Sequence, residues 1–299
     1  FNYSEFSVMT HVKHTDNGIT VNLPKITVKN QDVNINVAAQ YTHFDTPNFT
    51  LYGEVEGPKL GSIRQYLPKY LIPTETYDYL MSAIEKGRGE LTQVAISGDP
   101  TKMPYSDVSN SSNYGTFVLK ALIKEGQFKF DPTWPAIENM DAQLLIKDSL
   151  MTIKVGAGQF SSLKIDHDTE ADIALDAQQL KLELSLTPKN LMLEDFHSLI
   201  ETTPLKDILG DVFEFVKLKG ESTAAVNISI PLSDEPSSDG EVPEVLAWGR
   251  VKTNNADLSL PEINLNFEDV NSIVTFENST FKVESKDSRL FKLPISLEV

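Results

Sequence analysis

Apolar and polar residues alternate with a period of two through most of the chain, and this feature most restricts what it can fold into. In the clearest run, residues 180–187, four leucines alternate with Lys, Glu, Ser and Thr. Successive side chains of a β-strand point to opposite faces, so each such run has one apolar and one polar face. The pattern predicts a mainly β protein built from antiparallel strands. Similar runs occur at 19–23, 33–37, 49–55, 117–123 and 226–232.

Helical spacing is confined to two short regions, near residues 58–86 and 189–216. In the first, the apolar residues from Tyr77 to Ile84 recur at i, i+3, i+4 and i+7. In the second, an apolar stripe runs from Leu205 to Val216, directly after Pro204. This spacing is typical of amphipathic helices. Each region predicts a pair of short helices followed by a Gly and a new strand.

The order of these features repeats along the chain. The dipeptides Gly89-Glu90 and Gly220-Glu221 lie 131 positions apart, and a Pro follows each Gly eleven residues later. Residues 137–153 also align without gaps with residues 267–283, apolar opposite apolar at most positions. A unit of about 130 residues follows from this spacing. We expect 1–48 to end one copy, 49–180 to form a full copy with its helix pair near 58–86, and 181–299 to form a truncated copy with its pair near 189–216.

Composition and motifs point away from catalysis and from nucleic acid. The formal net charge is −17, and the 26 Lys and Arg residues are scattered, so the chain lacks the positive surface that phosphate backbones require. The absence of Cys excludes disulfides, thiolate metal sites and Cys nucleophiles. No hydrolase, zincin, phosphate-loop or dinucleotide motif occurs, and the His167–Glu170 segment is interpreted as a solvated turn. We therefore expect no catalytic residue, no metal and no cofactor.

The ends of the chain carry no targeting signal. No apolar run approaches the roughly 18 residues that a membrane span requires. The chain begins at Phe1 without a signal peptide, and it ends on the strand-like run from Leu293 to Val299. We therefore expect both ends to lie inside a longer polypeptide.

The apolar faces outnumber the helices that could cover them. A helix is about 10 Å wide and strands lie about 4.8 Å apart, so one pair of short helices covers roughly four strands. More than a dozen alternating runs are present, and most of the apolar face must meet something else. One alternative is a second sheet, which gives a β-sandwich. The other is a curved trough whose inner face binds acyl chains. The alternation alone favours the sandwich.

The order of short motifs resembles the AsmA-like superfamily, specifically the large YhdP-type proteins of Gram-negative envelopes. The resemblance covers most of residues 60–232. It rests on Tyr66-Leu67-Pro68, on Gly87 and Gly89, on Ser97-Gly98-Asp99-Pro100, on Trp134-Pro135 and on Thr203-Pro204-Leu205.

The resemblance implies an extended, curved antiparallel sheet of repeating β-groove units. It also implies a function: a periplasmic segment of an inner-membrane-anchored protein that carries phospholipid acyl chains between the inner and outer membranes. Envelope membrane proteins would then be partners at either end of the full-length protein. A structural or adhesive β-rod without ligand is the alternative, and a carbohydrate hydrolase is the least favoured. The residues expected to line the groove are the inward members of alternating strands, Phe117, Leu119, Leu182, Leu184, Val226, Ile228 and Ile230.

Overall fold

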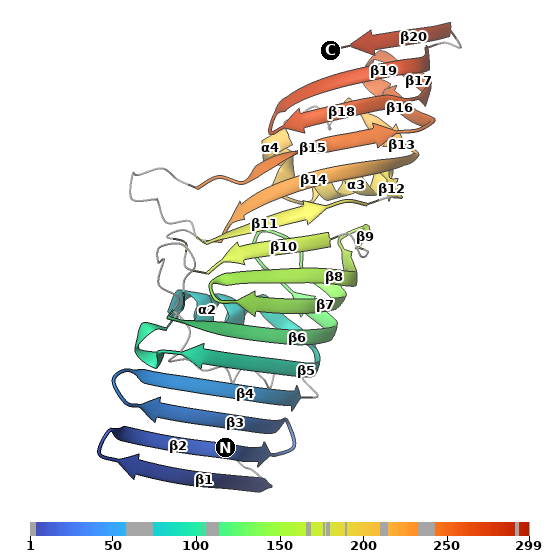
Figure 1. Ribbon diagram of the computed structural model, residues 1–299. Helices are drawn as coiled ribbons and strands as arrows, with labels where there is room; N and C mark the ends of the chain where they lie inside the picture. The colour runs from blue at the N-terminus through green and yellow to red at the C-terminus, as the bar shows by residue number, and fades with distance from the viewer. Residues whose placement is uncertain are drawn as a thin grey trace. The chain divides into compact units, whose positions relative to one another are not determined.

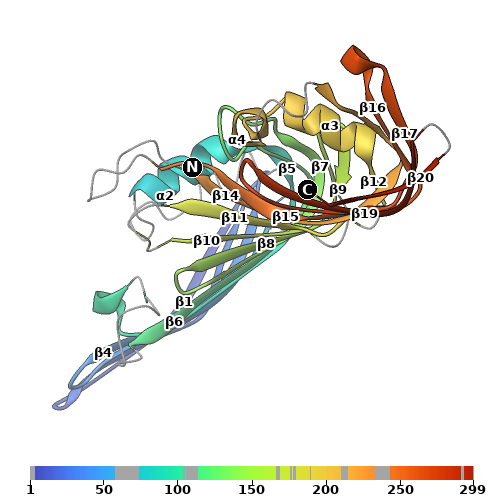
Figure 2. The ribbon, with the colours of Figure 1, turned by 90° about the horizontal axis from the view of Figure 1, so that it is seen from above.

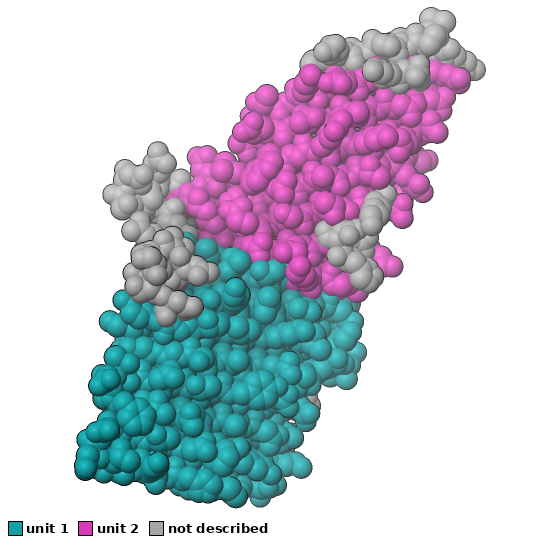
Figure 3. Space-filling view, in the orientation of Figure 1, with its two compact units in different colours: residues 1–129, 138–153, 174–177 teal, residues 130–137, 154–173, 178–299 magenta. Residues whose placement is uncertain are grey.

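The computed structural model describes residues 4–57, 74–103, 105, 114–165, 169–175, 177, 180–188, 190–209, 215–232, 243–290 and 293–298. It divides into two compact units (Figure 3). Unit 1 comprises residues 1–129, 138–153 and 174–177, and unit 2 comprises residues 130–137, 154–173 and 178–299. Strands dominate both units and pair in antiparallel ladders, with a few short helices, which confirms the fold class predicted from the alternation.

Unit 1 is a meander in which each strand from β1 to β6 pairs with the next along the chain (Figure 1). Helix α2 lies between β4 and β5 and contacts β5. The predicted partner of this helix, within residues 58–73, lies outside the described residues. The elements are β1 (Glu5–Thr15), β2 (Gly18–Lys29), β3 (Asn34–His43), β4 (Pro47–Gly57), α2 (Thr74–Ala83), β5 (Ile84–Gly98), the 3₁₀ turn η2 (Pro100–Lys102), β6 (Gly115–Phe128) and β7 (Ile137–Lys147).

The strand register of unit 1 places the apolar residues on one face. Leu23 of β2 lies opposite Ala39, which lies opposite Leu51. The row continues from Leu51 through Ile96 to Phe117 of β6. Because side chains alternate across a strand, this register places the five residues of the row on the same side of the sheet.

Unit 2 combines a curved antiparallel sheet with helices α3 and α4 on one face (Figure 2). Helices α3 and α4 lie within the range 189–216 for which the sequence predicts a helix pair. The elements are β8 (Leu150–Phe160, its second half in unit 2), β9 (Leu163–Ile165), β10 (Thr169–Ala174), β11 (Lys181–Leu186), β12 (Leu191–Met192), α3 (Leu193–Glu201), α4 (Leu205–Leu209), β13 (Lys217–Lys219), β14 (Glu221–Pro231), β15 (Leu246–Thr253), β16 (Ala256–Leu260), η3 (Pro261–Ile263), β17 (Leu265–Val270), β18 (Ser272–Glu277), β19 (Thr280–Leu290) and β20 (Leu293–Glu298).

Neighbouring strands of unit 2 are each divided into two segments by an interruption in the ladder. On both sides of the interruption the segments pair in the same order. Gly220, at φ 122°, separates β13 from β14, and Asn255, at φ 49°, lies between β15 and β16. Both conformations lie in the left-handed region, which Gly and Asn reach at low cost. Beyond the interruptions, β13, β16 and β17 continue the ladder that β14, β15 and β18 begin. Figure 2 shows β16 and β17 turning toward the side on which α3 lies.

Backbone details recur at the predicted spacing. We call residues 84–165 the first strand set and residues 217–298 the second. The backbone N–H of Phe117 donates to Asp148 Oδ1 at 2.8 Å, and the N–H of Ala247 donates to Asn278 Oδ1 at 2.9 Å. The corresponding residues lie 130 positions apart, and both Asp148 and Asn278 are left-handed. These matches support a unit of about 130 residues, whose boundaries at 48 and 180 stay a prediction.

Candidate functional site

A cavity of about 330 Å³ lies in unit 2 between the helix layer and the sheet. Its lining is almost wholly aliphatic and aromatic, with one carboxylate and four hydroxyls. The lining residues are Leu193, Phe196, Leu209, Val216, Leu218, Val251, Thr253, Ala256, Asp257, Leu258, Leu260, Phe267, Val270, Ser272, Val274, Phe276, Phe281, Val283, Ser285 and Ser288.

The helix side of the cavity is set by the amphipathic stripes of α3 and α4. Helix α3 buries Leu193 and Phe196 on the face toward the sheet and carries Glu194 and Asp195 in its first turn, where negative charge stabilises a helix. Thr203 connects the two helices: its Oγ1 donates to Leu199 O at 2.9 Å and accepts from Leu205 N at 3.3 Å. This buried link holds the two helices together over the sheet.

The sheet side of the cavity is formed by cross-strand rows on one face. Val251 of β15 lies opposite Val274 of β18, which lies opposite Val283 of β19. In the next row Phe276 lies opposite Phe281, with ring centroids 6.2 Å apart. Such pairs are the unit of side-chain packing in a sheet, and here they give a continuous apolar wall.

The hydroxyls in the lining are buried at the level where the strands are interrupted. Thr253 Oγ1 donates to Val270 O at 2.9 Å and accepts from Ser272 N at 2.9 Å. The Oγ atoms of Thr253 and Ser272 lie 2.9 Å apart, and Ser285 Oγ bonds Ser288 Oγ and Asn271 O. A hydroxyl has one proton to donate, so these protons are used within the protein. The hydroxyls therefore satisfy backbone groups at the bend and leave the wall without strong donors.

A second cavity of about 30 Å³ lies beside the first, still under the helix layer. Two of the predicted groove residues, Val226 and Ile228, line it. It is far smaller than the first cavity, about 30 Å³ against about 330 Å³. It is lined by Leu163, Leu186, Pro188, Leu191, Phe196, Leu199, Leu205, Leu209, Ala224, Val226, Ile228, Ala247 and Phe276.

The other predicted groove residues lie on apolar faces but line neither cavity. Leu182 is buried opposite Ile230, and Leu184 lies opposite Ile228, all on one face of β11 and β14. Phe117 and Leu119 are half-buried on the apolar face of β6 in unit 1. A role for the seven residues in lining a groove stays a prediction.

Sequence reasoning missed the residues that line the larger cavity. A signal for them existed in β19, where Phe281 and Val283 alternate with Lys282 and Glu284. In β18 the inward residues include Ser272, so the apolar alternation is interrupted there.

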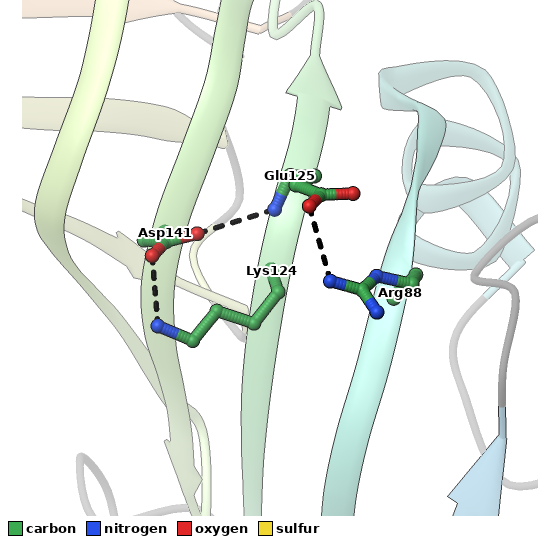
Figure 4. Close-up of polar contacts among 4 residues, drawn as sticks. All are labelled: Arg88, Lys124, Glu125 and Asp141. Carbon is green, nitrogen blue, oxygen red and sulfur yellow. Dashed lines mark hydrogen bonds and ion pairs between the residues drawn. The ribbon is translucent and has the colours of Figure 1, made fainter.

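Ionisable side chains converge in unit 1 on exposed and half-buried positions of β5, β6 and β7 (Figure 4). Lys124 Nζ lies 2.7 Å from Asp141 Oδ2, and Arg88 lies 3.0 Å from Glu125. The hydrogen bond from Lys124 lowers the pKa of Asp141, and the same bond raises the pKa of Lys124. Two positive and two negative charges cancel, and both carboxylates are engaged. The cluster links neighbouring strands through ion pairs that are open to solvent, which contribute little to stability.

Sites of other kinds were sought over the same described residues. No group of three or more His, Asp or Glu residues there is placed to hold a metal ion. None of the described helices is long and apolar enough to cross a membrane. Trp134 is 2% exposed and stacks on Phe160 at 6.3 Å between ring centroids, so it packs in the core and is not open to a ligand.

Comparisons with known proteins assign this chain to a family. The model of the YhdP protein family matches residues 1–299, so the chain belongs to that family. Among curated proteins, the intermembrane phospholipid transporter YhdP of Escherichia coli (strain K12) is 24% identical over 234 residues. The match covers 78% of this chain and 17% of that protein, so the chain spans only a small part of its relative's length. No solved structure matches significantly.

Proposed function

We propose that this chain, as a member of the YhdP family, holds phospholipid acyl chains on its apolar sheet face. It does so as part of a longer protein that moves phospholipid between the two membranes of a Gram-negative envelope. The carrying observation is the 330 Å³ apolar cavity in unit 2, lined by helices on one side and sheet on the other. The apolar face that carries Phe117 and Leu119 in unit 1 is proposed to contact acyl chains as well.

The chemistry of the cavity suits a lipid tail better than a headgroup. Burial of apolar surface contributes about 25 cal/mol per Å² without directional bonds. A phosphate would need cations or free donors, whereas the charged residue of the lining is Asp257 and the hydroxyls donate within the protein. The volume also lies in the range of small-molecule sites, roughly 300–1,000 Å³.

The wider role rests on the relative. The E. coli protein is named an intermembrane phospholipid transporter. We propose the periplasm as the place of action and envelope membrane proteins as partners at the ends of the full-length protein. Neither a metal nor a cofactor has a part in this proposal, because apolar contact alone holds the tail.

The test is mass spectrometry of organic extracts from the purified protein. Val274→Glu places a charge on the cavity wall, and Thr275→Glu places the same charge on the other face of the same strand. We expect phospholipid in the wild type and in Thr275→Glu, and a loss of most of it in Val274→Glu.

Two results would contradict the proposal. Wild-type protein without lipid would favour a structural rod. Equal lipid in the two variants, with both folded by circular dichroism, would show that the lipid binds elsewhere.

A further inference from the structure

We infer that Phe196, Leu209 and Phe276 form the bottleneck of the acyl path in unit 2. This inference rests on the proposed function and adds the residues that limit movement along the path. All three side chains line both the 330 Å³ cavity and the 30 Å³ cavity. They are therefore the common wall between two spaces under the same helix layer.

The bottleneck is built from both layers. Phe196 comes from α3 and Leu209 from α4, whereas Phe276 comes from β18 of the sheet. The three side chains are 9%, 3% and 6% exposed, so they are closely packed. Because side chains from both layers line both cavities, they lie between the two spaces.

Gly249 gives the ring of Phe276 its position. It lies opposite Phe276 on one side and Val226 on the other. A Cβ on Gly249 would lie 3.2 Å from Phe276 Cε1 and 2.4 Å from Ala225 O. The Phe276 ring therefore lies beside the position at Gly249 where another residue would carry a side chain. Gly249 in turn lies next to Val226, which lines the smaller cavity.

The two volumes determine what the bottleneck does. The smaller space, about 30 Å³ against about 330 Å³, leaves an acyl chain in the larger cavity little room to extend into it as it stands. Extension requires Phe196, Leu209 or Phe276 to move aside. The two helices that carry the first two are short, nine and five residues, and contact each other. Their side chains therefore control passage toward Val226 and Ile228.

Photo-crosslinking in the full-length protein tests this inference. A benzophenone amino acid replaces Phe281, which lines only the larger cavity, or Leu186, which lines only the smaller one. In the wild-type background we expect a phospholipid adduct at position 281 and a weak one at 186. Phe196→Ala removes one of the three side chains of the shared wall and should raise the ratio of the 186 adduct to the 281 adduct several-fold.

Phe130→Ala is the matched control, because Phe130 is 4% exposed but lines neither cavity. It should leave the ratio unchanged. If Phe196→Ala fails to fold, Phe196→Leu and Phe276→Leu decide by the same ratio. An unchanged ratio in folded variants with a strong 281 adduct overturns the bottleneck alone. Absence of the 281 adduct in the wild type contradicts the proposed function itself.

Discussion

At three buried positions the first strand set carries aliphatic side chains where the second carries hydroxyls. Ile123, Ala142 and Val155 lie 130 positions before Thr253, Ser272 and Ser285, and all six are less than 9% exposed. The second set satisfies its hydroxyls with backbone groups at the bend. Buried hydroxyls cost little when they are hydrogen-bonded. The two strand sets, whose backbone details recur, thus carry different buried side chains: aliphatic in the first set and hydroxyl-bearing in the second.

A second difference concerns how the two sets fill space. Leu119 and Ile146 of the first set correspond to Gly249 and Phe276 of the second, again 130 positions apart. In the first set the side-chain volume at these two positions is divided between Leu119 and Ile146. In the second set Gly249 has no side chain, and Phe276 supplies the whole volume. An aromatic side chain beside a cross-strand Gly is a known way to compensate for the missing side chain. Because the side-chain volume of this pair lies in Phe276 of β18, the second set has a ring in place to form the proposed bottleneck.

The largest expected effect on stability comes from replacing Gly249 and Phe276 of the second set by the residues at the corresponding positions of the first set. Gly249→Leu should lower the free energy of unfolding of the 299-residue chain by about 3 kcal/mol, because its Cβ meets backbone at 2.4 Å. Urea denaturation measures the loss. Gly249→Leu combined with Phe276→Ile should recover part of it, since the combination restores the first set's partition of volume. No recovery would mean that the two pairs are not equivalent.

A smaller effect is expected at the hydroxyls. Thr253→Val removes the acceptor of Ser272 N and the donor to Val270 O, both buried, and should cost about 1–3 kcal/mol. Thr253→Ser keeps the hydroxyl and should lose much less. Urea denaturation of the two variants side by side distinguishes the hydrogen bonds from the lost methyl. If Thr253→Val is as stable as the wild type, the hydroxyls are not needed at the bend.

The smallest effect concerns a charge that only the first set has. Asp141 Oδ1 accepts from Glu125 N at 3.2 Å, and its counterpart Asn271 accepts from Asn255 N at 3.0 Å. The pKa of Asp141 is lowered in the folded state, chiefly by Lys124. Its contribution to stability is therefore present above the unfolded pKa of about 3.9 and is lost as pH falls through the folded pKa.

Asp141→Asn should keep the backbone bond and remove this pH dependence. The difference in urea midpoint between wild type and variant should shrink from about pH 7 to about pH 3. A difference that stays constant over this range would show that the ion pair does not contribute.

Much of the fold could be predicted from the sequence, because alternation reports directly on which side chains share a face. Leu182, Leu184 and Leu186 were expected to face one way, and they pair with Ile230, Ile228 and Val226 on one face. The apolar stripe at Leu205 likewise predicted α4, whose buried residues are Leu205 and Leu209.

The position of the cavity could not be predicted in the same way. It depends on the interruptions at Gly220 and Asn255, which set where the sheet bends, and on which strands the helices cover. Alternation describes faces within a strand and carries no information on that covering. The residues that line the space, such as Val274 and Phe281, therefore look the same in sequence as those of a closed core.

The inward hydroxyls at the bend have a consequence for motion. Because their protons are committed to the protein, a hydrocarbon on this wall meets surface of nearly the same kind at every step. Hydroxyls that are bonded within the protein need no water partner, so under the proposed function an acyl chain has no such water to displace as it advances by one methylene. Under the proposed function, resistance to movement along this wall is therefore concentrated where side chains obstruct the way.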